Sequence, residues 1–363
     1  MIYNFGAGPA CLPNEVLNQI KADIPDWYEG MSIMELSHRA KCVMDLTAEI
    51  EADLRKVLSI PEEFAVLFMH GGARGQFSAI PLNCLHSAPV ADYLITGMWS
   101  KLAYYEAEKY CQPNSVVPID TLENTFESRI PDESTWQLSK NAPYLHYTDN
   151  ETIQGLEFPA VPQITLNPHQ WLICDMTSNI LSRPIDFSRM GLIYASAQKN
   201  LGIAGITVVI VRKSLLGKAH PLTPSIFDYK NYYESHSLYN TAPVFCWYVL
   251  GLVVKWFIKN GGMPAFEASC AEKSRLVYDV IDHSDFYTNP VFKPHRSRIN
   301  IPFRLPTEAL ETLFDQQAWS QGLKQLKGHK AVGGLRASLY NAMPMSGVKD
   351  LVDFMKHFEK THG

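Results

Sequence analysis

One lysine, held in a run of small residues between two apolar stretches, limits what this chain can fold into. The run covers residues 193–202 (Ile-Tyr-Ala-Ser-Ala-Gln-Lys-Asn-Leu-Gly), and the apolar stretch 206–211 follows shortly after it. Both apolar stretches have the length and composition of buried strands, which predicts a tight link carrying Lys199 between two core elements. Two interpretations stay open, a snorkelling or paired lysine near a strand end and a desolvated amine that acts as a Schiff-base nucleophile.

Apolar stretches of strand length alternate with helical patterns from about residue 15 to residue 260. The alternation predicts an α/β domain built on a largely parallel sheet. Asn240 or Thr241 is expected to cap the apolar helix that runs to Lys259, with Pro243 in its first turn. The expected strands are 64–69, 90–95, 144–147, 171–174 and 206–211, and the expected helices include 13–24, 41–58 and 101–110.

The last hundred residues change character. Helical patterns at 265–282, 307–326 and 347–362 alternate with strand patterns at 298–303 and 335–340, which predicts a smaller α+β domain. The expected division is therefore a large domain over 16–260 and a small C-terminal domain over 261–363. The N-terminal segment 1–15 is expected to pack with the small domain.

Several polar residues follow directly after expected strands. Glycines at 71 and 72 make a strand–turn–helix junction that can cradle a phosphate, or simply allow close packing. Trp99 is a domain-packing anchor or a stacking platform for a flat ligand. Asp175 either caps the turn at Thr177 or pairs with a cationic ligand atom. Open α/β sheets bind ligands at the carboxyl ends of their strands, so this coincidence favours one site there.

Composition excludes some classes of partner. The formal charge is −5 and like charges form no long run, so nothing favours nucleic acid or an acidic membrane surface. The seven cysteines are scattered without a Cys-x-x-Cys pair, which indicates reduced thiols in a cytoplasmic protein. The N-terminus lacks a signal-peptide pattern, and the most apolar stretch, 244–254, is too short to span a bilayer. We expect no bound metal ion.

The motifs taken together resemble those of the fold-type I, class V aminotransferases that depend on pyridoxal phosphate, and most closely the phosphoserine aminotransferase family. They occur in the family's order along nearly the whole chain. The matching segments are 4–9 (Asn-Phe-Gly-Ala-Gly-Pro), 37–39 (Ser-His-Arg), 70–77 (His-Gly-Gly-Ala-Arg-Gly-Gln-Phe), 150–153 (Asn-Glu-Thr-Ile), Asp175 with 180–184 (Ile-Leu-Ser-Arg-Pro), 197–200 (Ala-Gln-Lys-Asn), 239–241 (Tyr-Asn-Thr), 327–329 (Lys-Gly-His) and 333–338 (Gly-Gly-Leu-Arg-Ala-Ser).

The resemblance implies a role for each residue around the cofactor. Lys199 would bind pyridoxal phosphate covalently, Asp175 would pair with its ring nitrogen, and Trp99 would stack on its ring. Thr152 and Gln198 would hold the ring hydroxyl side and the phosphate. Further phosphate contacts would come from Ala73 and Arg74 and, across a homodimer with shared active sites, from Asn240 and Thr241.

The resemblance also implies two anion clamps for the substrate. Arg336 would hold the α-carboxylate, and Arg39, His38 and His329 would hold the distal anion, with some of these residues supplied by the neighbouring chain. The side chain of Arg74 is a further candidate. Ala7 stands where the family often has a serine, so only a main-chain contact could survive there. Ala73 in place of a glycine and Lys330 in place of an arginine are further departures from the family.

The implied activity is reversible ping-pong transamination between L-glutamate and 3-phosphohydroxypyruvate, giving 2-oxoglutarate and O-phospho-L-serine for serine biosynthesis. Relatives also use the four-carbon 3-hydroxy-2-oxo-4-phosphooxybutanoate of pyridoxine biosynthesis, and the sequence leaves this open. A cysteine desulfurase would need a mobile cysteine facing the cofactor, whereas Cys270 lies inside an expected helix. An alanine–glyoxylate aminotransferase would need no second anion clamp. A cofactor-binding regulatory protein without turnover would not need every catalytic position filled.

Overall fold

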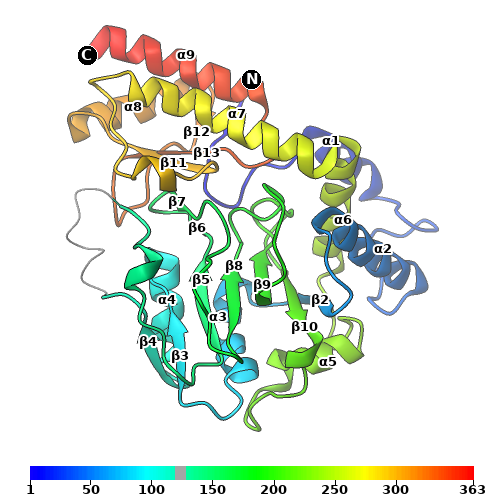
Figure 1. Cartoon of the computed structure of the whole chain (residues 1–363). Coiled ribbons are helices and arrows are strands. Elements are labelled where there is room, and N and C mark those ends of the chain that lie inside the picture. Colours follow the sequence, from blue (N-terminus) through cyan, green and yellow to red (C-terminus); the bar gives the residue numbers. More distant parts are fainter. Residues whose placement is uncertain (119–127) are drawn as a thin grey trace.

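A largely parallel sheet forms the centre of the molecule in the computed structural model, which describes residues 1–118 and 128–363 (Figure 1). Within the described residues the strand order is β2–β10–β9–β8–β5–β3–β4. Every neighbouring pair is parallel except those of β10, which runs antiparallel to both β2 and β9. The strands are β2 (Phe64–Met69), β3 (Val90–Tyr93), β4 (Gln112–Ser115), β5 (Tyr144–Thr148), β8 (Trp171–Asp175), β9 (Met190–Ser196) and β10 (Thr207–Arg212). The predicted sheet and its α/β class are confirmed.

Helices cover both faces of this sheet. One face packs against α3 (Gly72–Cys84), α4 (Met98–Ala107) and α5 (Tyr229–Glu234). The other face packs against α1 (Asn14–Asp23), α2 (Lys41–Leu58) and α6 (Val244–Lys259). The apolar positions predicted for α2 lie on its buried side, because a period of 3.6 residues places them on one face of the helix.

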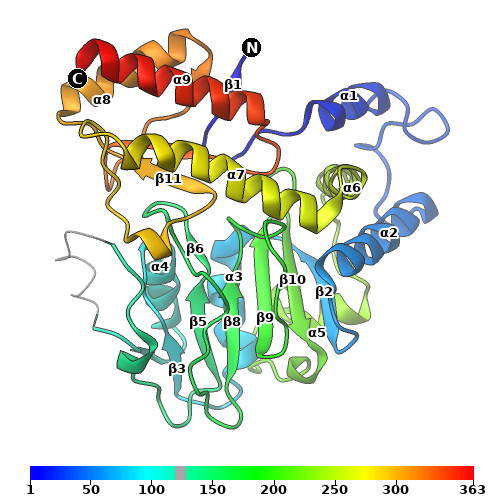
Figure 2. The same cartoon turned by 45° about the horizontal axis from the view of Figure 1, so that its top comes forward.

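A second core lies above the carboxyl ends of the strands (Figure 2). Its antiparallel pair β11–β13 packs with the C-terminal helices, and β1 pairs in parallel with β12. α7 contributes Phe266 to the core of the large sheet and Val277 to the second core, so the domain boundary near residue 260 stays a prediction. The elements are β1 (Tyr3–Asn4), β6 (Asn150–Glu151), β7 (Leu156–Glu157), α7 (Gly262–Asp282), β11 (Asn300–Phe303), α8 (Glu308–Ser320), β12 (Leu323–Lys324), β13 (Leu335–Ser338) and α9 (Met345–His362).

Several element ends differ from the prediction, among them the following three. The helix expected over 101–110 begins at Met98, which places Trp99 in its first turn. The helix expected over 307–326 ends at Ser320, because Gly322 adopts a positive φ of 89° and the chain then extends into β12. Neither Asn240 nor Thr241 caps α6; the N-cap is Pro243, without a side-chain cap bond. The polar edge strand β4 was not predicted.

No single described helix is long and apolar enough to cross a membrane. Only α6 and α7 taken together reach that length and composition, across a break bent by 85°. Trp247 and Leu250 of α6 are buried in the core of the large sheet, which accounts for the apolar character of that helix.

Candidate active site

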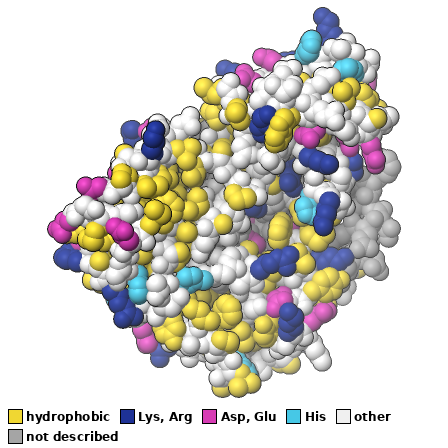
Figure 3. Space-filling view, turned by 180° about the vertical axis from the view of Figure 1, so that it is seen from behind, with side chains coloured by type: hydrophobic (Ala, Val, Ile, Leu, Met, Phe, Trp, Pro, Cys, Tyr) yellow, Lys and Arg dark blue, Asp and Glu magenta, His cyan; other side chains and the backbone are white. Residues whose placement is uncertain are grey.

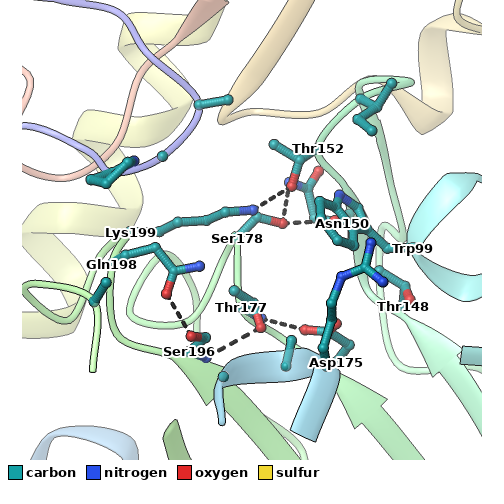
Figure 4. Close-up of a pocket in the computed structure, with 18 of the residues that line it drawn as sticks. Trp99, Thr148, Asn150, Thr152, Asp175, Thr177, Ser178, Ser196, Gln198 and Lys199 are labelled. Atoms are coloured by element: carbon teal, nitrogen blue, oxygen red, sulfur yellow. Dashed lines mark hydrogen bonds between the residues drawn. The ribbon is translucent and has the colours of Figure 1, made fainter. Parts of the chain in front are cut away.

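A cavity of about 700 Å³ opens at the carboxyl ends of β5, β8 and β9 (Figure 4). This volume is in the range of small-molecule and cofactor sites. The cavity brings together ten of the predicted site residues: Ala7, Ala73, Arg74, Trp99, Thr152, Asp175, Gln198, Lys199, His329 and Arg336. The carboxyl edge of the sheet, where the sequence predicted a ligand site, therefore contains a cavity.

Lys199 lies in the β9–β10 link, under the N-terminal segment. The backbone N–H of Ala10 donates to the carbonyl of Gln198 over 2.8 Å, and a side chain at Gly8 would meet the stem of Lys199 at 3.6 Å. Lys199 is only 9% exposed, and its Nζ donates to Oγ1 of Thr152 over 2.5 Å. Burial lowers the pKa of Lys199 to about 8, against the opposing effect of Asp175. These features favour a nucleophilic amine over a snorkelling lysine.

Asp175 is the last residue of β8 and is 4% exposed. Its Oδ1 accepts a hydrogen bond from the backbone N–H of Thr177 over 2.8 Å, so the predicted turn cap exists. Burial raises the pKa of the Asp175 carboxyl, while its hydrogen bonds and Lys199 oppose that shift. The same carboxylate also lines the cavity, so capping the turn does not keep it away from a ligand.

Hydrogen bonds to a residue of β6 hold the backbone of Trp99 in place. Buried Glu151 accepts hydrogen bonds from the backbone N–H groups of Trp99 (3.0 Å) and Ser100 (2.8 Å). A carboxylate at a helix N-terminus satisfies free amides and complements the helix dipole, which explains the early start of α4. The ring centre of Trp99 lies 5.9 Å from Nζ of Lys199, so both predicted cofactor contacts face one space.

The glycine turn after β2 starts α3 at the rim of the cavity. Gly71 and Gly72 have positive φ angles of 92° and 63°, which other residues rarely adopt. The turn places the first amides of α3, including those of Ala73 and Arg74, at the cavity. The start of a helix offers free N–H groups and the positive end of the helix dipole. These groups suit a phosphate.

Buried polar atoms in the cavity wall support a cofactor fit. Within the described residues, Thr148 Oγ1, Asn150 Oδ1 and Arg336 Nε have no hydrogen-bond partner. Native structures rarely leave such atoms unpaired. A flat ligand with polar ring substituents and an anionic group would satisfy them, so the donor set fits pyridoxal phosphate.

The cavity also holds part of the predicted substrate clamp. Arg336 contacts the carbonyl of Thr152 over 3.4 Å, and burial lowers the pKa of its guanidinium. A buried, incompletely paired guanidinium favours an incoming carboxylate. His329 lines the same cavity.

Among the described residues, four predicted site residues lie elsewhere. His38 and Thr241 line a separate cavity of about 450 Å³. Arg39 donates through Nε to His38 over 3.2 Å, and the side chain of Asn240 contacts Nε2 of His70 over 3.1 Å. One chain alone therefore does not bring these residues to Lys199.

Sequence reasoning missed some lining residues. Ser178 Oγ donates to the carbonyl of Asn150 over 2.6 Å, and Ser196 Oγ donates to Gln198 Oε1 over 2.5 Å. Thr148 and Asn150 lie in the same polar stretch as Thr152, so that stretch was a usable signal. The remaining missed lining residues include Thr177, Ala204 and Gly205.

Comparison with known proteins gives one consistent family. The family model described as aminotransferase class-V matches residues 2–351. A curated phosphoserine aminotransferase of Laribacter hongkongensis (strain HLHK9) is 50% identical over 364 residues, which cover 100% of this chain and 99% of that protein. The solved phosphoserine aminotransferase from Bacillus circulans subsp. alkalophilus has a TM-score of 0.95 and 43% identity, over 100% of this chain and 99% of that one. The pyridoxal-phosphate-bound phosphoserine aminotransferase of Trichomonas vaginalis has a TM-score of 0.92 and 41% identity, over 98% and 100%.

Proposed function

The chain belongs to the class-V aminotransferases, and within them to the phosphoserine aminotransferase family, and on this basis we propose that it transfers the amino group of L-glutamate to 3-phosphohydroxypyruvate. The products would be 2-oxoglutarate and O-phospho-L-serine, in a reversible ping-pong cycle serving serine biosynthesis. The observation that carries the proposal is one cavity that joins the buried amine of Lys199 to Asp175 and Arg336.

The enzyme depends on pyridoxal phosphate, as its family does. When bound, this cofactor supplies an electron-poor ring that withdraws electrons from the substrate's α-carbon. Lys199 would hold it covalently, Asp175 would face the ring nitrogen, and Trp99 would stack on the ring. The amides of Ala73 and Arg74 would hold the phosphate.

Lys199 is also the base that the proposed reaction needs. Its pKa of about 8 leaves a useful neutral fraction near neutral pH, and Thr152 fixes the direction of Nζ. Once substrate has displaced the lysine, Nζ would take the proton from the substrate's α-carbon and deliver it to the C4′ atom of the cofactor on the same face. Gly8 of the N-terminal segment lies against the stem of Lys199, so this segment limits the entry of water to the amine.

L-Glutamate and 3-phosphohydroxypyruvate each carry an α-carboxylate and a second anionic group at the other end of the molecule. Arg336 would hold the α-carboxylate in both half-reactions, with His329 near the distal anion. His38 and Arg39 would complete the distal clamp from a neighbouring subunit. Their separation from the Lys199 cavity within one chain supports this assignment.

A homodimer would require an apolar contact surface. Met31, Met34 and Met44, on and before α2, are exposed. Figure 3 views the molecule from behind and shows apolar side chains gathered at its left. This is the side that carries α1, α2 and α6, which lie at the right of Figure 1. Exposed apolar patches of this kind commonly mark protein contacts.

Two further points follow the family pattern. The four-carbon keto acid 3-hydroxy-2-oxo-4-phosphooxybutanoate carries the same two anions, so we extend the proposal to its conversion to 4-phosphohydroxythreonine in pyridoxine biosynthesis. All seven cysteines are free thiols, which supports a reducing, cytoplasmic location. Cys270 is buried in α7, away from the position a desulfurase would require.

The test is a single half-reaction. Adding L-glutamate to the purified, cofactor-loaded protein should convert the yellow lysine-bound chromophore to the absorbance of the amine form, and 3-phosphohydroxypyruvate should restore it. An unchanged spectrum would refute the proposal.

Lys199→Ala should remove the lysine-dependent chromophore and turnover while the protein still folds and dimerises. Comparing kcat/KM for the three- and four-carbon keto acids then tests the substrate range.

A further inference from the structure

Residues 7–9 of the N-terminal segment lie at the cavity and are held there by one hydrogen bond. All three line the cavity, and Gly8 lies against the stem of Lys199. The carbonyl of Ala7 accepts from the hydroxyl of Tyr340 over 2.7 Å. Within the described residues, residues 7–9 make no other hydrogen bond. The position of this part of the segment therefore depends on one tyrosine.

Tyr340 lies at the end of a row of buried polar side chains. Asn300 of β11 donates from Nδ2 to the Tyr340 hydroxyl over 3.3 Å and to Oγ of Ser338 over 2.9 Å. Its Oδ1 accepts from Nδ2 of Asn150 over 2.8 Å. Asn150 also donates to Oγ of Ser178 in the cavity wall over 2.8 Å (Figure 4). Each of these side chains is 2% exposed or less. The row thus joins β6 and β11 to Tyr340, just after β13.

The backbone carbonyl at the end of the row fixes its direction. A carbonyl only accepts, so Tyr340 donates to Ala7 and accepts from the amide of Asn300. Asn300 then presents its oxygen to Asn150, which donates. The opposite direction would point the Tyr340 proton at Asn300 and away from the Ala7 carbonyl. Burial raises the pKa of Tyr340, so its hydroxyl keeps the proton that this bond needs.

We infer that Tyr340 and Asn300 are positioning residues that hold residues 7–9 in place beside Lys199 for the incoming substrate. The inference rests on the proposed function, which makes Lys199 the reacting amine, and on the main-chain substrate contact predicted at Ala7. Without the bond, residues 7–9 would be tied only through their neighbours, and a substrate would have to order them when it binds. Tyr340 thereby affects substrate affinity through the backbone of Ala7.

Tyr287 provides a matched control for Tyr340. It is a tyrosine of the second core with 1% exposure, and its hydroxyl donates to the carbonyl of Met355 in α9 over 2.8 Å. Tyr340→Phe and Tyr287→Phe each lose one buried hydrogen bond from a tyrosine to a carbonyl. Only Tyr340→Phe loses it at the N-terminal segment. A role in stability alone predicts the same behaviour of both variants.

The first readout is hydrogen–deuterium exchange of residues 6–12 in the cofactor-loaded protein, measured by mass spectrometry. The N–H of Ala10 reports directly, because it donates to the carbonyl of Gln198 over 2.8 Å. Exchange in this segment should be about tenfold faster in Tyr340→Phe, the effect of one lost hydrogen bond. Tyr287→Phe should stay within about twofold of the wild type.

The second readout is a comparison of KM with kcat. The KM for L-glutamate should rise about tenfold in Tyr340→Phe, with kcat within about twofold of the wild type, because the loss falls on substrate binding. Tyr287→Phe should change neither constant. Equal exchange and equal KM in the two variants would overturn the inference and leave Tyr340 a residue of the packed core only.

A pair of asparagine variants covers the case in which Tyr340→Phe does not fold. Asn300→Ala removes the donor to Tyr340, whereas Asn289→Ala removes an amide that bonds the Pro302 carbonyl over 2.6 Å and the Val291 N–H over 2.9 Å. Exchange of residues 6–12 should be about threefold faster in Asn300→Ala alone, since its hydrogen bond acts on the segment through a second one. Identical exchange in the two variants would contradict the inference.

The two proposals fail in different ways. A wild-type protein that does not react with L-glutamate would refute the proposed function. A reactive wild type whose Tyr340 and Asn300 variants behave as their controls do would refute the inference alone.

Discussion

At the scale of single residues, the reactivity proposed for Lys199 would come from where the chain buries it. The amine is held by Thr152 and loses hydration under the N-terminal segment. An ordinary lysine is almost fully protonated at neutral pH, whereas one with a pKa of about 8 is partly neutral. The amine is therefore suited, before any ligand arrives, to the nucleophilic role that we propose for it.

The rate at which cofactor-free protein captures pyridoxal phosphate should follow the ionisation of Lys199. Only the neutral amine attacks, so the rate should rise about tenfold per pH unit below pH 8 and level off above it. Stopped-flow absorbance measures this rate. The matched control is Lys199→Ala, which retains the other buried lysine, Lys273, and should capture nothing. A rate that kept rising about tenfold per pH unit up to about pH 10 would count against the lysine's lowered pKa.

Arg336 should matter for substrate and not for folding. Arg336→Gln should lower kcat/KM about a hundredfold for both L-glutamate and the keto acid, because both present an α-carboxylate. The melting temperature should change little, since Nε has no partner among the described residues. The control is Arg275→Gln, which removes an exposed arginine paired with Asp279 and should leave the kinetics unchanged. A loss confined to one substrate would contradict the shared clamp.

Residues at strand ends were the predictable part of the site. Lys199, Asp175 and Trp99 each follow an apolar stretch, and parallel strands place such positions together. Tyr194 of β9 and His146 of β5 lie inside strands, where alternation identifies a buried face but not the neighbour that each side chain meets. The hydrogen bond between the Tyr194 hydroxyl and Nε2 of His146 depends on strand order, which the sequence pattern leaves undetermined.

At the scale of elements, buried ion pairs link the turn after β5 to the strand that opens the second core. Glu157 of β7 is buried, and it pairs with Arg298, just before β11, over 2.9 Å. Arg298 outweighs the effect of burial and holds the pKa of Glu157 below its usual value. This contact fixes the second core over the carboxyl ends of the sheet.

Replacing Arg298 should destabilise the protein in a pH-dependent way. Arg298→Met removes the guanidinium partner of buried Glu157, which keeps only its hydrogen bonds from Asn179 and the backbone N–H of residue 298, and should cost about 3 kcal/mol of unfolding free energy at pH 7. A carboxylate with a lowered folded pKa stabilises above its ordinary value of 4.5 and loses that contribution as pH falls through the folded pKa. The deficit should therefore shrink as the pH falls below 4.5 in urea unfolding.

The control for this experiment is Lys293→Met, which removes a largely exposed lysine paired with Asp282. Surface pairs of this kind contribute less than about 1 kcal/mol. A deficit of the same size at pH 4 and pH 7 in Arg298→Met would show that lost packing, and not charge, is the cause.

Element types were predicted well, and element ends less well. The period of apolar residues located α2 and β2 at their observed bounds. The start of α4 depends instead on Glu151, which is far away in sequence and caps the helix from β6. Such a boundary is decided by tertiary contact, so local pattern placed it three residues late.

At the scale of the whole molecule, one chain does not bring all the proposed site residues together. Arg39 and His38 lie apart from the Lys199 cavity among the described residues, together with Thr241. The sequence identified these residues through family resemblance, and one chain's fold alone cannot bring them to the cofactor. Closed twofold dimers supply such residues reciprocally.

Mixed dimers should show this exchange directly. Lys199→Ala and Arg39→Ala chains, each with little activity for the phosphorylated keto acid, should regain about a quarter of wild-type activity when refolded together. Half of the dimers would then be mixed, each with one intact site. Combining Lys199→Ala with Arg336→Ala is the matched control and should restore nothing, because both residues line one cavity. No recovery in the first mixture would place Arg39 outside the partner's site.

The short strand β1 has a consequence for how the lysine pocket forms. Tyr3 and Asn4 pair with Leu323 and Lys324, and the carbonyl of Phe5 accepts from the N–H of Ser338. The same segment then covers Lys199. The cover over Lys199 can therefore form only once β12 and β13 are in place. Completion of the lysine pocket thus depends on docking of the second core, and not on the large sheet alone.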